Sequence, residues 1–326
     1  MQVIIPLAGK GTRLRPHTHL VPKPLIKVAG RPVLDWVMDK LVGLPIEELI
    51  FITGHLKEQV ESYVHQRYTI PARFVEQRIQ DGTAGAINLA RPFVHGPVLI
   101  IFVDTVFEAD LTLINRSTAD GIIWAKEVED YQRFGVVVTD QDGYMTKIVE
   151  KPSEPISKLA NIGLYYIRDV ESLWRGIDHV LNSPANKGEF YLTDAFQWMI
   201  EQGKKILTAE VGGWYDCGKL DTLLETNEIL LKQGAARSGK FPGVTLLDPV
   251  LIEDGVSIER STIGPNVSIE QGTTITDSEI SHSIIGSQCR VSDARLTRSM
   301  LGAQAVVKNV RGSASLGDHG EIIGSI

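Results

Sequence analysis

Glycines and basic side chains gather directly after the first apolar run of the chain. Val3–Ile5 has the composition of a buried strand, and Gly9 and Gly11 follow it in a loop. Glycine lets the backbone adopt positive φ and brings its N–H groups close to a bound anion. Arg13 and Lys23 add positive charge around this loop. The arrangement favours a polyphosphate site, although an ordinary strand and turn with solvated charges has the same residue types.

Two familiar phosphate-binding fingerprints do not fit this loop. The dinucleotide pattern G-x-G-x-x-G would need a third glycine where Leu14 stands. No Gly-Lys-Ser/Thr closes the loop, so the Walker pattern does not fit either. The residues of this loop therefore exclude both of these classes of phosphate-binding loop.

An acidic residue follows the most apolar run of the chain. The run is Val98–Val103, and Asp104 comes directly after it. Taken alone, an aspartate at such a place could simply cap a helix or lie in a loop.

The first half of the chain alternates apolar strands with helices, which predicts an α/β, Rossmann-like, mostly parallel sheet covered on both faces. The expected strands are Val3–Ile5, Leu49–Thr53, Arg73–Glu76 and Val98–Val103, and the expected helices are Pro32–Leu41, Leu56–His65 and Thr83–Leu89. Ligands of such sheets bind at the carboxyl ends of the strands. Both the glycine loop and Asp104 fall there.

The alternation loosens after residue 120. The expected strands are 121–125, 135–139, 146–150, 160–167 and 206–211, and the expected helices are 170–180, 194–201 and 219–232. Asp140–Gly143 has the residues of a hairpin turn. We expect a catalytic domain at residues 1–236, with a linker at its end, Gly234–Gly239.

Aliphatic residues recur every five or six positions from Asp248 onward. They are Ile252, Ile258, Ile263, Ile269, Ile275, Ile280, Ile285, Val291, Leu296, Leu301 and Val307. A hexapeptide repeat gives this spacing, each unit being one side of a parallel β-helix, whereas a Val/Ile-rich β-sandwich would be a different solution for the same residues. We expect a second domain at residues 244–326 with about three coils, which needs capping by the first domain or by another subunit of a homo-oligomer.

Composition limits the class of protein further. The 326 residues suffice for two domains, and a net charge of −7 argues against general nucleic-acid binding. Two distant cysteines, Cys217 and Cys289, provide no disulfide framework and indicate a reducing compartment. No apolar run reaches about 18 residues. We therefore expect a cytoplasmic protein without nucleic-acid or membrane partners.

The segments Leu7–Thr18 and Pro22–Leu25 resemble the signature of the sugar-1-phosphate nucleotidylyltransferases, (L/V)-A-G-x-G-T-R-(L/M)-x-P-x-T followed by P-K-x-L. The resemblance implies an enzyme in which a sugar-1-phosphate attacks the α-phosphate of an NTP, giving a nucleotide sugar and pyrophosphate. Two anions must be held in line for this reaction. Positioning, cations and Mg²⁺ therefore matter more than a nucleophilic side chain.

The resemblance assigns nucleotide binding to the first loop. The implied backbone ligands of the base, ribose and phosphates are Leu7, Ala8, Gly9, Gly11 and Thr12. Arg13 would grip the triphosphate through its planar fork, and Lys23 would hold the α-phosphate in the transition state. Arg15 is at least as well explained as a solvated surface residue.

Gln77, followed by Gly82, resembles the base-reading segment of the family. A side-chain amide can pair with the edge of a pyrimidine, and Gly82 permits close approach of the backbone. Gln80 is the rival of Gln77 for this role.

Asp104, and Asp216 within W-x-D-x-G, resemble the two metal-binding carboxylates of the family, which implies a Mg²⁺ cofactor. Two carboxylates from separate strands can share one hard cation through their oxygen atoms. Each residue alone could instead cap a helix or lie in a loop. Asp104 would also face the nucleotide. The family usually has glycine where Val103 stands, and this departure puts backbone contacts near the nucleoside in doubt.

The sugar phosphate would bind to a second group of motifs. Glu150–Pro152 resembles the E-K-P motif, in which Lys151 neutralises the phosphate and Glu150 bonds sugar hydroxyls. Phe134–Val136 and Asn161–Tyr165 resemble two further sugar-facing segments. The implied ligands are Gly135, Glu150, Lys151 and Asn161. Gly188–Asp194 resembles a segment that we interpret as structural, in which Thr193 and Asp194 could cap the following helix.

The end of the chain resembles the long form of glucose-1-phosphate thymidylyltransferase, which adds a left-handed β-helix. The opening Ile5–Gly9 instead resembles UTP–glucose-1-phosphate uridylyltransferases, so dTTP and UTP, and the hexose, stay open. The sequence is also compatible with a mannose-1-phosphate guanylyltransferase, a bifunctional acetyltransferase with His282 or His319 as base, or a non-catalytic paralogue that binds nucleotide sugars. The paralogue is expected to lack some of the cations and carboxylates that are present here.

Overall fold

The computed structural model describes residues 1–325. They form two compact units, each of which is described by itself. Unit 1 comprises Met1–Gly9 and Val37–Trp214, and unit 2 comprises Lys10–Trp36 and the chain from Tyr215 onward. The expected domain boundary between residues 236 and 244 stays a prediction, because compact packing does not show which segment folds alone.

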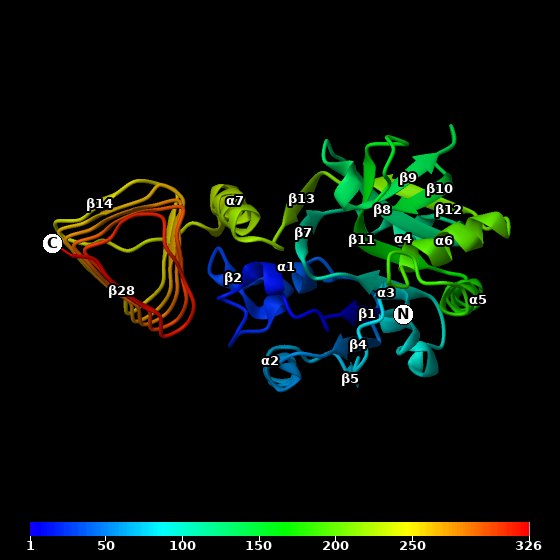
Figure 1. The fold of residues 1–326 in the computed structure, drawn as a ribbon, viewed down its shortest axis with the longest axis horizontal. Helices are drawn as coiled ribbons and strands as arrows, with labels where there is room; N and C mark the ends of the chain where they lie inside the picture. Colours follow the sequence, from blue (N-terminus) through cyan, green and yellow to red (C-terminus); the bar gives the residue numbers. More distant parts are fainter. Residues whose placement is uncertain (326) are drawn as a thin grey trace. The chain divides into compact units, whose positions relative to one another are not determined.

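A nine-stranded mixed sheet forms the centre of unit 1 (Figure 1). β1 pairs in parallel with β4 and β6, and β4 pairs in parallel with β5. These strands are β1 (Gln2–Pro6), β4 (Glu48–Thr53), β5 (Ala72–Glu76) and β6 (Val98–Ile101). The predicted parallel order is confirmed in this half of the sheet.

The other half of the sheet is built around one long strand, β11. It pairs antiparallel with β6, β8 and β9; β9 forms the predicted hairpin with β10, and β12 adds to β8 in parallel. These strands are β8 (Gly121–Glu127), β9 (Gly135–Thr139), β10 (Met145–Glu150), β11 (Leu159–Ile167) and β12 (Ile206–Glu210). The short strands β7 (Thr105–Glu108) and β13 (Gly213–Asp216) lie outside this sheet.

Helices α3, α5 and α6 share one buried cluster with the sheet. Ile87, Trp174 and Phe196 from these helices belong to the same cluster as Ile4 and Ile100 from the strands. Alternate strand residues serve this face, because successive side chains of a strand point to opposite faces. The helices are α2 (Lys57–Arg67), α3 (Thr83–Asn88), α4 (Leu113–Arg116), α5 (Val170–Leu181) and α6 (Leu192–Glu201), with short turns at η3 (Arg91–Phe93) and η4 (Tyr131–Arg133).

The N-terminal part of unit 2 is short and tightly turned. Gly11 has φ 61°, a left-handed conformation that glycine adopts without steric cost, and a 3₁₀ turn follows it directly. The elements are η1 (Thr12–Leu14), η2 (Lys23–Leu25), β2 (Lys27–Val28) and β3 (Arg31–Pro32), after which α1 (Val33–Asp39) begins. Later in the chain come α7 (Leu220–Leu230) and the π-helical turn η5 (Leu231–Ala235).

The chain after residue 244 forms a three-sided parallel β-helix, drawn from yellow to red in Figure 1. The first side holds β14 (Thr245–Leu246), β17 (Thr262–Ile263), β20 (Glu279–Ser281), β23 (Arg295–Thr297) and β26 (Arg311–Gly312). The second holds β15 (Val250–Ile252), β18 (Val267–Ile269), β21 (Ile284–Ile285), β24 (Met300–Leu301) and β27 (Ser315–Leu316). The third holds β16 (Ser257–Glu259), β19 (Thr274–Thr276), β22 (Arg290–Ser292), β25 (Val306–Lys308) and β28 (Glu321–Ile323). This architecture agrees with the predicted left-handed β-helix and not with a sandwich.

The expectation of about three coils is wrong, because each side carries five strands. Aliphatic spacing misses the end coils, where small or partly exposed residues such as Ala314 and Leu316 replace isoleucine. The coils also shorten along the chain: Val250 pairs with Val267, whereas Met300 pairs with Ser315. A fixed repeat length therefore drifts out of phase with the coils.

Buried serines join neighbouring coils of the β-helix. The Ser278 backbone N–H donates to Ser261 Oγ at 3.0 Å, and the Ala294 N–H donates to Ser278 Oγ at 3.1 Å. A second column repeats this between Ser283 and Ser299, where the N–H···Oγ distance is 3.0 Å. These hydroxyls satisfy backbone N–H groups that the tight corners leave without a strand partner.

No helix among residues 1–325 is both long enough and apolar enough to cross a membrane. Cys217 and Cys289 are buried free thiols. Burial raises the pKa of the Cys289 thiol to about 11, so this thiol stays protonated at neutral pH.

Candidate active site

The first loop leaves β1 along the end of β4. The Leu7 N–H donates to Ile52 O at 2.7 Å, Leu7 and Ala8 are buried, and Gly9 is exposed. A Cβ at Gly54 would lie only 2.8 Å from Ala8 O. Gly54 therefore lets the chain after β4 touch the loop, a role that sequence reasoning missed because no motif marks this glycine.

Both glutamines considered for base reading lie beside this loop region. Gln80 Nε2 donates to Ala8 O at 2.6 Å. Gln77 is buried, and its Nε2 makes long hydrogen bonds to Asp81 Oδ1, at 3.3 Å, and to Gly82 O, at 3.4 Å. Gln80 contacts the loop directly, whereas the Gln77 side chain bonds to Asp81 and Gly82. Which glutamine reads the base stays a prediction.

Gly82 has φ 125°, and its position excludes any side chain. A Cβ there would lie 2.4 Å from Phe190 O and 2.5 Å from Phe190 N. The Phe190 carbonyl also accepts a hydrogen bond from the Ala84 N–H at 2.9 Å. The sequence predicts that Gly82 permits close approach of the backbone to a ligand. In unit 1 the closest neighbour of Gly82 is the backbone of the Gly188–Asp194 segment.

Asp104 lies in the turn between β6 and β7 and is half-buried. β6 ends at Ile101, so Asp104 stands beyond the strand and does not end it as expected. Burial, followed by the charges of Glu150 and Asp104, raises the pKa of Tyr165 well above its usual value. Asp104 and Glu150 therefore both act on the same buried phenol.

Four residues of the expected sugar site converge in unit 1. Asn161 Nδ2 donates to Gly135 O at 2.8 Å, and Tyr165 donates its hydroxyl hydrogen to Asn161 Oδ1. A Cβ at Gly135 would lie 2.2 Å from Asn161 Nδ2 and 2.9 Å from Glu150 Oε2. The sequence predicted Gly135, Glu150 and Asn161 separately, and antiparallel pairing around β11 brings them together.

Thr193 belongs to the same cluster, although the sequence suggested only a helix cap. Thr193 Oγ1 donates to Glu150 Oε2 at 3.1 Å. α6 begins at Leu192, after the N-cap residue Tyr191, so neither Thr193 nor Asp194 occupies the cap position. Contact with a candidate ligand could not be inferred from sequence because Glu150 and Thr193 are 43 residues apart in the chain.

Lys151 is held beside Glu150 in an unusual backbone conformation. Its φ is 46°, a left-handed conformation that is uncommon for a residue other than glycine. Lys151 Nζ lies 3.8 Å from Glu150 Oε1 and 4.9 Å from the ring centroid of Tyr191, and Lys187 Nζ donates to Lys151 O at 2.9 Å. Burial raises the pKa of Glu150, and the neighbouring Lys151 charge opposes that shift.

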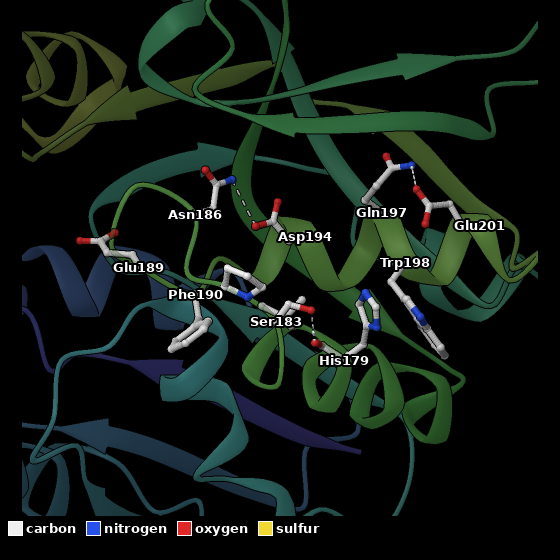
Figure 2. Close-up of a pocket in the computed structure, with 11 residues that line it drawn as sticks. His179, Ser183, Asn186, Glu189, Phe190, Asp194, Gln197, Trp198 and Glu201 are labelled. Carbon is white, nitrogen blue, oxygen red and sulfur yellow. Dashed lines mark hydrogen bonds between the residues drawn. The ribbon is translucent and has the colours of Figure 1, made fainter.

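The Gly188–Asp194 segment borders a cavity of about 220 Å³ between α5 and α6, shown in Figure 2. Asn186 Nδ2 donates to Asp194 Oδ2 at 3.3 Å, and desolvation raises the pKa of Asp194. His179 stacks with Trp198 at the other side of this cavity. The segment thus contacts Gly82 through the Phe190 backbone and Glu150 through Thr193, and its structural role stays a prediction.

Unit 2 carries the remaining loop residues. Thr12 and Arg13 are exposed, Lys23 is half-buried, and Thr18 Oγ1 donates to Gly11 O at 2.8 Å. A Cβ at Gly11 would lie 3.1 Å from Lys23 Cβ. The structure therefore brings Gly11 and Lys23 together, 12 positions apart in the chain.

Asp216 and Arg13 meet at Gly218. Asp216 Oδ1 accepts a hydrogen bond from the Gly218 N–H at 2.7 Å, and its carbonyl accepts one from Thr226 Oγ1 at 3.0 Å. A Cβ at Gly218 would lie 2.8 Å from Asp216 Oδ1 and 3.1 Å from Arg13 Nη2. The glycine of W-x-D-x-G thus leaves room for a carboxylate and a guanidinium at one place.

No group of three or more His, Cys, Asp or Glu side chains among residues 1–325 could by itself hold a metal ion. Asp104 and Asp216 are both half-buried carboxylates. Thr105 Oγ1, next to Asp104, is a buried polar atom without a hydrogen-bond partner in the described chain. Carboxylate oxygens fit Mg²⁺, which keeps waters and substrate oxygens as its other ligands. That these two aspartates share one ion stays a prediction.

The two histidines considered for acetyl transfer occupy corners of the β-helix. His282 has φ 48° and His319 has φ 60°, as do other residues at these left-handed corners. His282 Nδ1 lies 3.1 Å from Asn266 Nδ2 and 3.5 Å from Glu228 Oε2. Corner geometry accounts for the backbone of both histidines, and the two contacts account for the side chain of His282.

Residues 2–233 match the sequence profile of the nucleotidyl transferase family. The chain belongs to this family, and the resemblance drawn from the first loop is confirmed. It is therefore a transferase, an enzyme of nucleotidyl transfer.

Three curated relatives lie close to it. It is 32% identical to bifunctional protein GlmU of Methanococcus aeolicus, covering 89% of this chain and 74% of the relative. It is 33% identical to the UTP–glucose-1-phosphate uridylyltransferase AglF of Haloferax volcanii, covering 66% and 89%. It is 26% identical to glucose-1-phosphate thymidylyltransferase of Streptomyces griseus, covering 87% of each chain.

A solved structure supports the fold. A UDP-glucose pyrophosphorylase complexed with UDP-glucose matches with a TM-score of 0.65 over 71% of this chain and 98% of that chain, at 22% identity. The predicted α/β sheet is thus confirmed by a solved structure with the same fold.

Proposed function

We propose that this chain transfers a nucleotidyl group from an NTP to a hexose-1-phosphate, with dTTP or UTP as nucleotide and glucose-1-phosphate as acceptor. The observation that carries the proposal is the convergence of Gly135, Glu150, Asn161 and Thr193 beside Lys151. A carboxyl, an amide and a hydroxyl suit sugar hydroxyls, and a lysine suits the phosphate. Relatives named for glucose-1-phosphate and for UTP or a thymidylyl group support the same substrates.

The reaction needs two anions in line. A phosphate oxygen of the sugar-1-phosphate forms the new bond to the α-phosphorus of the NTP, and the bond to pyrophosphate breaks, so that pyrophosphate leaves with its electron pair. Lys151 would neutralise the acceptor phosphate, Lys23 the α-phosphate and Arg13 the leaving phosphates. No proton acceptor is required, because the attacking oxygen is already anionic.

Asp104 and Asp216 would hold Mg²⁺. When bound, the ion would neutralise phosphate charge and help align the two substrates. The first-loop backbone from Leu7 to Thr12, with Gly82, would enclose the nucleoside, and Gln77 or Gln80 would read the base.

A substrate matrix tests the proposal. Pyrophosphate release is measured with dTTP, UTP, GTP, CTP and ATP against glucose-, galactose-, mannose- and N-acetylglucosamine-1-phosphate. We expect turnover with dTTP or UTP and glucose-1-phosphate. Preference for GTP with mannose-1-phosphate would replace the proposed substrates, and nucleotide-sugar binding without turnover of any pair would contradict the enzyme assignment.

A further inference from the structure

The segment Lys10–Trp36 packs onto the β-helix within unit 2. His17 is only 3% exposed, and its Nε2 lies 3.0 Å from Ser315 Oγ in β27. The other ring nitrogen, Nδ1, is buried without a hydrogen-bond partner in residues 1–325. The hydroxyl of Ser315 is thus the polar contact that fixes the orientation of this ring.

The backbone of the last coil touches the same place. A Cβ at Gly317 would lie 3.2 Å from both Pro16 Cβ and Pro16 O. A residue larger than glycine at position 317 must therefore push against the chain just before His17. The last coil and the first loop segment fit together at their backbones as well as through side chains.

Two further contacts fix the rest of the segment. Lys27 Nζ lies 2.8 Å from Glu270 Oε2, directly after β18. The Ala29 N–H and the Ser268 hydroxyl both donate to Asn227 Oδ1 at 2.9 Å, and Asn227 in α7 is fully buried. The segment is thus held at two heights of the β-helix.

Neighbouring residues connect these contacts to the first loop. His17 is followed by Thr18, whose hydroxyl donates to Gly11 O at 2.8 Å. A Cβ at Gly11 would touch both Thr18 and Lys23. A shift of His17 therefore displaces Gly11, and Lys23 beside it.

We propose that the last coil of the β-helix positions the first loop for nucleotide binding, with His17 as the positioning residue between Ser315 and Gly11. This inference rests on the proposed function for the identity of the loop's ligand. The β-helix then acts in nucleotide binding without touching the nucleotide. Its contribution is to keep Gly11 and Lys23 in place before the NTP arrives, which lowers the ordering cost of binding.

The test uses the full chain with Ser315→Ala, Ser315→Thr and Gly317→Ala. Ser315→Ala removes one hydrogen bond, so we expect the KM for the NTP to rise about fivefold to tenfold. The KM for the sugar phosphate should stay within about twofold, because Lys151 and Glu150 lie in unit 1 and keep their contacts. Gly317→Ala should act in the same direction, and Ser315→Thr, which retains the hydroxyl, should restore the wild-type value.

Ser281→Ala is the matched control, since Ser281 Oγ bonds Thr297 Oγ1 on another side of the β-helix. It should leave the KM for the NTP unchanged. Equal KM values for the NTP in wild type, Ser315→Ala and Gly317→Ala would overturn the proposal, as would an equal rise in Ser281→Ala.

Hydrogen exchange of the ligand-free chain separates this inference from the proposed function. Amides of residues 10–25 should exchange faster in Ser315→Ala and Gly317→Ala than in wild type, while residues 244–300 keep their protection. If the wild-type chain turns over no substrate pair, the proposed function fails, and exchange still decides whether the coil holds the loop. Unchanged exchange in both variants would contradict the positioning role.

Discussion

At the scale of residues, the arrangement of the candidate sugar site depends on the absence of a side chain at Gly135. Gly135 is the residue around which an amide, a carboxyl and a hydroxyl assemble, because any Cβ there would overlap Asn161 Nδ2 at 2.2 Å. Half-buried Glu150 keeps a raised pKa while Lys151 stands beside it. Such a cluster is arranged before substrate binds, and small displacements within it are costly.

Gly135→Ala should therefore displace Asn161 and Glu150 together. We expect kcat/KM for the sugar-1-phosphate to fall about hundredfold, as for a misplacement on the order of 1 Å, with a smaller change in the KM for the NTP. Steady-state kinetics measure both values. Gly96→Ala is the control, since no atom lies within 4 Å of its Cβ position. Equal kinetic constants in the two variants would contradict the sugar-site assignment.

Asp104→Asn should keep the fold, because the exchange is isosteric and the residue is half-buried. We expect nearly all Mg²⁺-dependent turnover to disappear, since a neutral amide is a poor ligand for a hard cation. Turnover against MgCl₂ concentration and the circular dichroism spectrum check both parts. Near-native activity would show that Asp104 does not hold the metal.

His17 should make the protein sensitive to acid. Burial lowers the pKa of His17 to about 4, against 6.5 in the unfolded chain. Between these values the unfolded chain binds a proton that the folded chain does not, so stability falls as pH drops from 6.5 to 4. The slope is up to about 1.4 kcal/mol per pH unit.

His17→Gln should remove this contribution to the pH dependence. Urea unfolding at pH 7 and pH 4.5 gives the free energies of unfolding to compare. The same exchange at exposed His19 is the control. An unchanged difference between the two pH values in His17→Gln would exclude His17 as the source.

At the scale of elements, the serine columns hold the coils of the β-helix together. Ser278 Oγ donates to Thr276 O at 2.7 Å and accepts from the Ala294 N–H. Ser278→Ala leaves this buried N–H without its acceptor. We expect a loss of about 1–3 kcal/mol in the free energy of unfolding, measured by urea titration. Exposed Ser257→Ala, the control, should stay near wild type, and an equally small loss at Ser278 would mean that the column is not stabilising.

Most of the fold could be predicted from the sequence because unbroken apolar runs and turn residues are local signals. The parallel half of the sheet, the hairpin at Asp140–Gly143 and the β-helix were all predictable in this way. Five coils were not, because buried Ala314 and half-buried Leu316 take the place of isoleucine in the end coils. The contacts of Thr193 with Glu150 and of His17 with Ser315 were not predictable either, since they join elements that only the folded chain brings together.

At the scale of the whole molecule, packing within unit 2 bears on where the chain can be divided. A chain of residues 1–236 would lose Glu270 as partner of Lys27, Ser268 as partner of Asn227, and Ser315 as partner of His17. The homo-oligomer and the cytoplasmic location expected from the sequence stay predictions.

Residues 1–236 expressed alone should therefore melt at a lower temperature than the full chain and show a higher KM for the NTP. A chain ending at residue 310 loses the coil with Ser315 but keeps Glu270 and Ser268, and should lie between the two. Differential scanning fluorimetry and steady-state kinetics measure these values. Identical melting temperatures for all three chains would mean that the catalytic part does not depend on the β-helix.

The β-helix contacts the segment Lys10–Trp36 at two points, which lie a fixed distance apart along the axis of the β-helix. Glu270 directly follows β18, and Ser315 begins β27, which is three strand spacings further along the same side. Parallel strands lie about 4.8 Å apart, so these attachment points are separated by about 14 Å. Inserting one coil between them would preserve every strand pairing and yet carry Ser315 about 4.8 Å away from His17. The contacts of the segment Lys10–Trp36 therefore permit only one number of coils between Glu270 and Ser315. Coils can be added to the β-helix without breaking these contacts only outside this interval.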